Sequence, residues 1–240
     1  MQDLNIKGLT IGEMPSKICV PITASTQDAI LEEAKEITKT KAQLVEWRCD
    51  YYEDCKDIAK VVDTLKKLSA ILVKLPLIFT FRTINEGGNC DIKASEYLLL
   101  YKTAMLSKTV DLVDVEFMRE EATINNIIKH AKTAGIAVIL SHHDFDSTPP
   151  QDKIVSRLRM MEKMGAHICK VAYMPRNESD VENMKASCNL AKNEEIRFVA
   201  ISMGELGKST RLDASKLGSC ITFASFGNES APGQIQINEL

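Results

Sequence analysis

The sequence has no apolar run long enough to cross a lipid bilayer. Its apolar runs, such as Pro76–Phe81, are far shorter than the roughly 20 residues that a membrane-spanning helix needs. The first residues, MQDLNIKGLTIGE, carry an acid at position 3 and no apolar core, so they do not resemble a signal peptide. These absences argue against a membrane or secreted protein, and we expect a cytoplasmic one.

The sequence also lacks a basic cluster. Its formal net charge is −3, with the lysines and arginines spread along the chain. Proteins that bind nucleic acids or anionic membranes usually gather positive charge on one face. Neither is therefore expected as the main partner.

No pair among the seven cysteines has the Cys-x-x-Cys spacing of metal or redox motifs. The number is odd, and several cysteines lie inside apolar, strand-like runs. We therefore expect free, mostly buried thiols in a reducing compartment.

No low-complexity segment or Pro/Gly/Ser-rich linker divides the 240 residues, which predicts one domain over residues 1–240. Short β-branched runs alternate with segments of helical periodicity. In the second such segment Val61, Leu65 and Leu68 fall on one helix face, opposite lysines. The strand-like runs are Lys17–Ile22, Gln43–Cys49, Pro76–Arg82, Leu112–Phe117, Ala137–His143, Ala166–Met174, Arg197–Met203 and Ser219–Phe226.

Eight strands alternating with helices favour an α/β fold of the (β/α)8 barrel type. An open Rossmann-type sheet would have Gly-x-Gly-x-x-Gly after its first strand, and residues 20–26 contain no glycine. Residues 4–12 resemble a short hairpin that would close the amino-terminal end of the barrel. Few residues follow the eighth strand, so we expect a short or missing eighth helix.

Charged residues interrupt the strands on one face only. Alternate side chains of a barrel strand point inward, and active sites lie at the carboxyl ends of the strands. By this alternation five charged or titratable residues share the inward face near those ends: Glu46, Arg48, Arg82, His143 and Lys170. By the same alternation Asp114 and Glu116 also point inward, and they are expected to line or support the pocket.

Lys170 stands among apolar neighbours, where an unpaired ammonium is costly. Partial burial and the neighbouring Arg48 and Arg82 would disfavour the ammonium form. A neutral amine can condense with a ketone or aldehyde to form a Schiff base, which acidifies the adjacent C–H group. His143 would serve as the base, and Glu86 could fix its tautomer.

Further residues suggest an anionic substrate. Arg211 suits bidentate recognition of a carboxylate, and Ser230 and Gln234 offer a hydroxyl and an amide on a turn after the last strand. Gly207-Lys-Ser209 resembles the tail of a phosphate-binding loop, but the first required glycine falls on Ser202. His142, His143 and Asp144 cannot share one strand face, and no second cluster accompanies them, so no metal site is expected.

Taken together, these motifs resemble the type I 3-dehydroquinate dehydratase family. The matching residues occur in the family's order over nearly the whole chain: Glu46-Trp-Arg48-Cys-Asp50, Phe81-Arg-Thr83, Glu86-Gly-Gly88, Asp114-Val-Glu116, Ser141-His-His-Asp-Phe145, Lys170-Val-Ala172, Ile201-Ser-Met-Gly204 with Arg211, and Ser230-Ala-Pro-Gly-Gln-Ile235.

The resemblance implies a cofactor-free barrel enzyme, commonly a homodimer, that converts 3-dehydroquinate to 3-dehydroshikimate in the shikimate pathway. It implies that Lys170 forms the Schiff base, that His143 is the acid–base group and that Glu86 orients His143. Substrate binding would fall to Glu46, Arg48, Arg82, Arg211, Ser230 and Gln234. Where the family often has a serine after the first strand, this chain has Pro21, with Thr23 nearby.

Two other functions remain open at this point. A class I Schiff-base aldolase shares the barrel and the lysine but cleaves a carbon–carbon bond. A non-catalytic binding protein could use the mouth of the barrel without chemistry.

Overall fold

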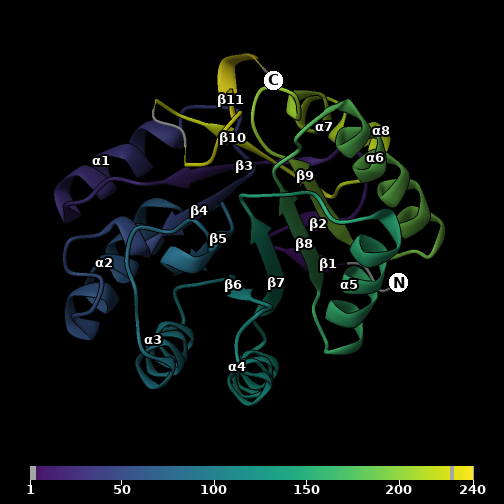
Figure 1. Ribbon diagram of the computed structural model, residues 1–240. Helices are drawn as coiled ribbons and strands as arrows, with labels where there is room; N and C mark the ends of the chain where they lie inside the picture. Colours follow the sequence, from purple (N-terminus) through teal and green to yellow (C-terminus); the bar gives the residue numbers. More distant parts are fainter. Residues whose placement is uncertain (1–3, 228–229, 240) are drawn as a thin grey trace.

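The computed structural model describes residues 4–227 and 230–239 and shows parallel strands surrounded by helices (Figure 1). The barrel strands are β3 (Lys17–Ile22), β4 (Leu44–Arg48), β5 (Leu77–Thr80), β6 (Leu112–Glu116), β7 (Ala137–Asp144), β8 (Ile168–Tyr173), β9 (Phe198–Ser202) and β10 (Ile221–Ser225). The helices are α1 (Gln27–Ile37), α2 (Ile58–Ile71), α3 (Ala94–Leu106), α4 (Glu121–Ala134), α5 (Gln151–Lys163), α6 (Glu178–Asn193), α7 (Lys208–Leu212) and α8 (Ala214–Leu217). From β3 to β9, each strand pairs in parallel with the next along the chain.

The sheet closes on itself. Strand β10 pairs with β3, which joins the last barrel strand to the first. Between β9 and β10 the backbone N–H of Cys220 donates to the carbonyl oxygen of Phe198 at 2.8 Å. The predicted (β/α)8 barrel is confirmed.

Side-chain alternation gives the barrel two separate apolar layers. On β4, Val45 and Trp47 pack outward against the helices, whereas Leu44 packs inside the barrel. On β5, Phe79 faces outward and Ile78 inward. Because both faces of each strand are buried, a charged side chain on a strand is tolerated only where it has a partner of opposite charge or a solvated cavity.

Local sequence signals set the helix boundaries. The side chain of Asp57 accepts hydrogen bonds from the amides of Ala59 and Lys60, which starts α2. The side chain of Thr26 caps α1 by accepting a hydrogen bond from the amide of Ala29. Gly135, at a φ of +69°, ends α4 in the left-handed conformation that favours glycine.

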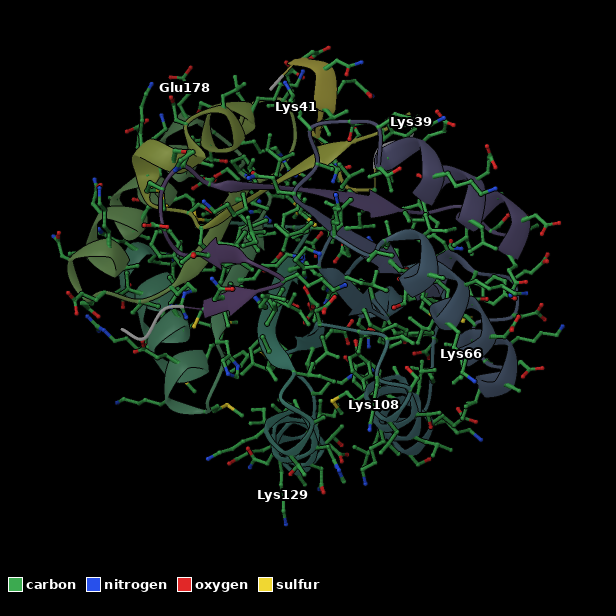
Figure 2. All side chains as sticks on the ribbon, turned by 180° about the vertical axis from the view of Figure 1, so that it is seen from behind. Lys39, Lys41, Lys66, Lys108, Lys129 and Glu178 are labelled. Atoms are coloured by element: carbon green, nitrogen blue, oxygen red, sulfur yellow. The ribbon has the colours of Figure 1, made fainter. Side chains whose placement is uncertain are left out.

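An antiparallel hairpin of β1 (Leu4–Ile6) and β2 (Leu9–Ile11) closes the amino-terminal end of the barrel, as predicted. Ile11 is fully buried inside the barrel, and Leu4, Ile6 and Leu9 pack against the same inner layer. In the rear view the two short purple strands of the hairpin lie to the left of the centre (Figure 2).

The chain after β10 turns back over the other end. Within the described residues it forms β11 (Ile235–Gln236), parallel to β10, and the 3-10 turn η3 (Ile237–Glu239), where the barrel pattern would place an α-helix after its eighth strand. Two other 3-10 turns, η1 (Cys49–Tyr51) and η2 (Ile84–Glu86), follow β4 and β5. In the described part of the chain, no helix combines the length and apolar character that a bilayer crossing requires.

Candidate active site

The nine residues predicted for the site all line one cavity of about 40 Å³ at the carboxyl ends of the strands. They are Glu46, Arg48, Arg82, Glu86, His143, Lys170, Arg211, Ser230 and Gln234. Apolar side chains, among them Phe145, Met203 and Phe223, complete its wall. A larger cavity of about 730 Å³ beside the hairpin contains none of these nine residues.

Lys170 points into this cavity from the middle of β8 and is 5% exposed. Its Nζ donates to Asp114 Oδ2 at 3.1 Å and lies 3.9 Å from Glu46 Oε1. The ring of Phe223 lies beneath it, with its centroid 4.2 Å from Nζ. A lysine amine is thus held at the inner wall between two carboxylates and an aromatic face.

The charged groups in contact with Lys170 differ from those expected. The sequence suggested arginine neighbours, but Arg48 is paired with Asp50 and Arg82 with Asp114. The physical reason is that buried guanidinium groups need carboxylate partners of their own. The carboxylates of the site therefore separate Lys170 from the arginines.

Asp114 is the centre of this network. Its Oδ1 accepts hydrogen bonds from the guanidinium of Arg82 at 2.6 Å and from the hydroxyl of Ser141 at 2.5 Å, and its Oδ2 accepts from Lys170. Burial alone would raise the pKa of Asp114, but Arg82, Lys170 and Ser141 hold it well below its usual range. The carboxyl stays ionised and fixes both cations.

We predict that Asp114→Asn lowers the free energy of unfolding by about 3–5 kcal/mol, because it leaves buried cations without their partner. Urea unfolding followed by circular dichroism would measure this change. Asp63→Asn is the matched control, since Asp63 pairs with Lys67 on the exposed surface of α2 and should give little measurable change. Equal stabilities of the two variants would contradict the role of Asp114.

His143 and Glu86 form a second pair. Glu86 Oε2 accepts a hydrogen bond from the backbone N–H of His143 at 3.2 Å and lies 3.0 Å from His143 Nδ1. Because Oε2 already accepts from the backbone, we assign it as the acceptor for Nδ1–H as well. The imidazole Nε2 then carries the lone pair, as a general base requires.

The environment keeps this pair neutral. Burial lowers the pKa of His143 well below its usual value, and the positive charges of Arg82 and Lys170 lower it further. Burial raises the pKa of Glu86 to about 8, while Arg82 acts in the opposite direction. At neutral pH the imidazole is therefore unprotonated and able to take up a proton.

The raised pKa of Glu86 predicts a pH-dependent stability. Since the folded protein holds this proton more tightly than the ordinary value of 4.5 implies, the stabilisation is complete below about pH 4.5 and is lost as pH rises towards 8. Relative to Glu86→Gln, the unfolding free energy of the wild type should fall with pH by at most ~1.4 kcal/mol per unit. Urea unfolding of both proteins between pH 5 and 8 tests this, and parallel curves would rule it out.

Asp50 is a site residue that the sequence reasoning did not assign. Its two carboxylate oxygens clamp the guanidinium of Arg48, each at 2.8 Å. They also accept the backbone N–H groups of Arg82 and Asn89, both at 3.1 Å. Asp50 lies in η1, beyond the end of β4, so strand parity could not locate it. Its position in the Glu46–Asp50 motif was the available signal.

Glu116, the last residue of β6, plays a similar part. Its carboxylate accepts the N–H of Thr83 at 2.6 Å and the Thr83 hydroxyl at 3.0 Å, and it pairs with Arg119. Thr83 begins the turn η2, which carries Glu86. The expected supporting position of Glu116 matches these contacts.

The loop after β10 covers the mouth of the barrel. Gln234 Oε1 accepts the N–H of Ser230 at 2.7 Å and its hydroxyl at 3.2 Å. Arg211, from α7, reaches the carbonyl oxygens of Phe223 and Pro232. The three residues assigned to carboxylate recognition thus lie around one short loop above Lys170.

The other histidines and the thiols have structural surroundings. His142 contacts the hydroxyl of Tyr173 and the guanidinium of Arg157. His167 Nδ1 accepts the N–H of Val138. All seven cysteines are free, as predicted. Over residues 4–227 and 230–239, no group of three or more His, Cys, Asp or Glu residues is arranged to hold a metal ion.

Comparison with known proteins gives a consistent result. The family model for type I 3-dehydroquinase matches residues 18–240. The 3-dehydroquinate dehydratase of Listeria monocytogenes serovar 1/2a is 40% identical over 241 residues, covering 100% of this chain and 96% of the relative. That of Klebsiella pneumoniae is 37% identical, covering 99% and 95%.

Solved structures agree with the sequence relatives. The type I 3-dehydroquinate dehydratase of Clostridium difficile, determined with covalently modified comenic acid, has a TM-score of 0.96 and 36% identity, covering 99% of this chain and 94% of its own. The 3-dehydroquinate dehydratase of Geobacillus kaustophilus also has a TM-score of 0.96, with 32% identity and coverage of 99% and 93%. With this match over its full length, the chain belongs to the type I 3-dehydroquinase family.

Proposed function

We propose that this protein is a hydro-lyase that dehydrates 3-dehydroquinate to 3-dehydroshikimate in the shikimate pathway through a Schiff base on Lys170. The observation that carries the proposal is one cavity lined by a buried lysine amine and by a neutral histidine held by a carboxyl group. Membership of the type I 3-dehydroquinase family supports the same chemistry.

The first step joins enzyme and substrate. Lys170 passes one ammonium proton to His143 Nε2, and its amine then attacks the substrate ketone. The carbonyl oxygen takes up one proton from the attacking nitrogen and the one held by His143, and it leaves as water, which gives a protonated imine. The positive imine nitrogen withdraws electrons from the adjacent carbon. Asp114 and Glu46, on either side of Nζ, stabilise this cation by the same contacts that they make with the amine.

The second step removes water from the substrate. His143 Nε2 takes the proton from the carbon next to the imine, and the electron pair forms an enamine. The imidazolium then gives that proton to the hydroxyl on the next carbon, which departs as water and leaves a conjugated imine. One base acting on one face gives a syn elimination, and Glu86 holds the ring in place throughout.

The third step releases the product. Water, activated by His143, attacks the conjugated imine and returns Lys170 as an amine. Around these reacting atoms, Arg211, Ser230 and Gln234 hold the substrate carboxylate, while Glu46, Arg48 and Arg82 bind its ring hydroxyls and organise the pocket. Their location around the same cavity supports these assignments.

A direct assay tests the proposal. Purified protein mixed with 3-dehydroquinate should produce the ultraviolet absorbance of a conjugated enone, and mass spectrometry should find a single product one water lighter than the substrate. A class I aldolase would instead give two carbon fragments without the enone. No change in absorbance, or carbon–carbon cleavage, would overturn the proposed reaction.

The remaining expectations concern the protein as a whole. We propose one catalytic domain over residues 1–240, active as a cytoplasmic homodimer without metal or organic cofactor. The free thiols support a reducing compartment. Light scattering should give twice the chain mass of 26.7 kDa, and dialysis against a chelator should leave activity unchanged.

A further inference from the structure

Two cysteines from separate loops meet close to the site. Cys55 lies between η1 and α2, and Cys90 lies between η2 and α3. Their sulfur atoms are 3.5 Å apart, with the thiol of Cys55 donating to Cys90 Sγ. The proposed dehydration uses neither thiol.

The two thiols differ in accessibility. Cys90 is half-buried, whereas Cys55 is only 5% exposed. Burial, together with the Cys90 thiol, raises the pKa of Cys55 to about 12. Because Cys90 is the more exposed of the two, it is the residue that a small oxidant meets first, and Cys55 is its resolving partner.

Both loops connect directly to the site. Asn89, which precedes Cys90, donates its N–H to Asp50 Oδ2, and Asp50 clamps the guanidinium of Arg48. Glu86 lies four residues before Cys90, at the end of η2. A covalent bond between the loops would draw the sulfurs from 3.5 Å to the ~2.05 Å of a disulfide, and Asn89 would move with Cys90.

We propose that Cys55 and Cys90 are a peroxide-sensitive modification site, whose reversible disulfide lowers activity through the Asn89–Asp50–Arg48 contacts. This inference goes beyond the proposed function. The Cys90 thiolate attacks peroxide, forming an S–O bond and breaking the O–O bond, and one water leaves after protonation. The Cys55 thiol then gives its proton to the departing hydroxyl while its sulfur attacks the Cys90 sulfur, forming the S–S bond and releasing the second water. Two thiols lose two electrons and two protons, and peroxide is reduced to two waters.

Peptide mapping after hydrogen peroxide treatment tests the chemistry. The thiol titre of the denatured protein should fall from seven to five, and trypsin should release residues 49–56 linked to residues 83–93, separable by dithiothreitol. Cys55→Ser and Cys90→Ser should each abolish this link. Because Cys49 shares the first peptide, Cys49→Ala is the matched control and should keep the link. No link, or a link that persists through Cys49 in Cys55→Ser, would overturn the assignment of the pair.

Kinetics test the effect on the site. The oxidised protein should show a lower kcat/KM for 3-dehydroquinate, by as much as about 10²-fold if Asp50 shifts by ~1 Å, and dithiothreitol should restore it. Cys90→Ser should keep its activity in peroxide. A disulfide without any kinetic change would overturn the coupling to Arg48. Absence of activity in the reduced protein would count against the proposed function and leave the peptide result unaffected.

Discussion

Lys170→Met is expected to abolish turnover, with a loss on the order of 10⁴–10⁶-fold, because no other group in the site can form the imine. Borohydride added with 3-dehydroquinate should leave a reduced, covalent adduct on the Lys170 peptide of the wild type and none on the variant. Methionine fills similar space at the inner wall, and Asp114 keeps its pair with Arg82. The variant should therefore fold, as circular dichroism would show.

Lys17 provides the control for this experiment. It is another buried lysine on a barrel strand, 8% exposed, but it belongs to β3 and donates to the carbonyl oxygens of Glu13 and Pro15. Its amine lines no part of the proposed site. Borohydride should leave it unmodified, and an adduct on Lys17 instead of Lys170 would refute the Schiff-base assignment.

His143→Ala should still form the imine and yet lose about 10²–10⁴-fold in turnover, the usual contribution of general acid–base catalysis. The reason is that the imine depends on Lys170, whereas proton removal depends on the imidazole beside Glu86. Single-turnover mixing followed by borohydride would show the substrate imine accumulating on the variant. The loss should appear in kcat rather than in substrate binding.

The adjacent histidine serves as the comparison. His142 has the opposite parity on β7 and contacts Tyr173 and Arg157 instead of the proposed site. His142→Asn should keep turnover close to that of the wild type. If His143→Ala also turned over normally, the imidazole would have no place in the mechanism.

The strands were predictable because both of their faces are buried. Lys17–Ile22 has the bounds predicted for it, and the other seven runs agree to within two residues at each end. Alternation also placed Glu46 and Lys170 on the inner face. A shift by one residue would turn the apolar side chains that pack against the helices inward and turn these two charged side chains toward the helices. The fold and the strand residues of the cavity therefore follow from period-two patterning, whereas Glu86, Arg211 and Gln234 lie outside the strands.

Pairing inside the site could not be predicted in the same way. The alternation along a strand predicts which face a side chain occupies but not which side chain it contacts. The contact between Lys170 and Asp114 could therefore be identified only from the three-dimensional structure. Asp50 lies in a turn without strand periodicity and joins segments 32 and 39 residues away. Such contacts depend on loop conformations that the local sequence does not encode.

Among the described residues, the hairpin closes the lower end of the barrel, so we expect substrate, product and water to pass at the opposite end. Ile11 blocks one end, and the segment Ser230–Gln234 lies over the other, above a space of about 40 Å³ that has room for about one water molecule. In the proposed cycle, water leaves twice and is consumed once. The water expelled from the substrate is released next to the imine that water must later hydrolyse. The opening at the carboxyl end of the barrel can therefore stay closed between elimination and hydrolysis, and it needs to open only for the exchange of product and substrate.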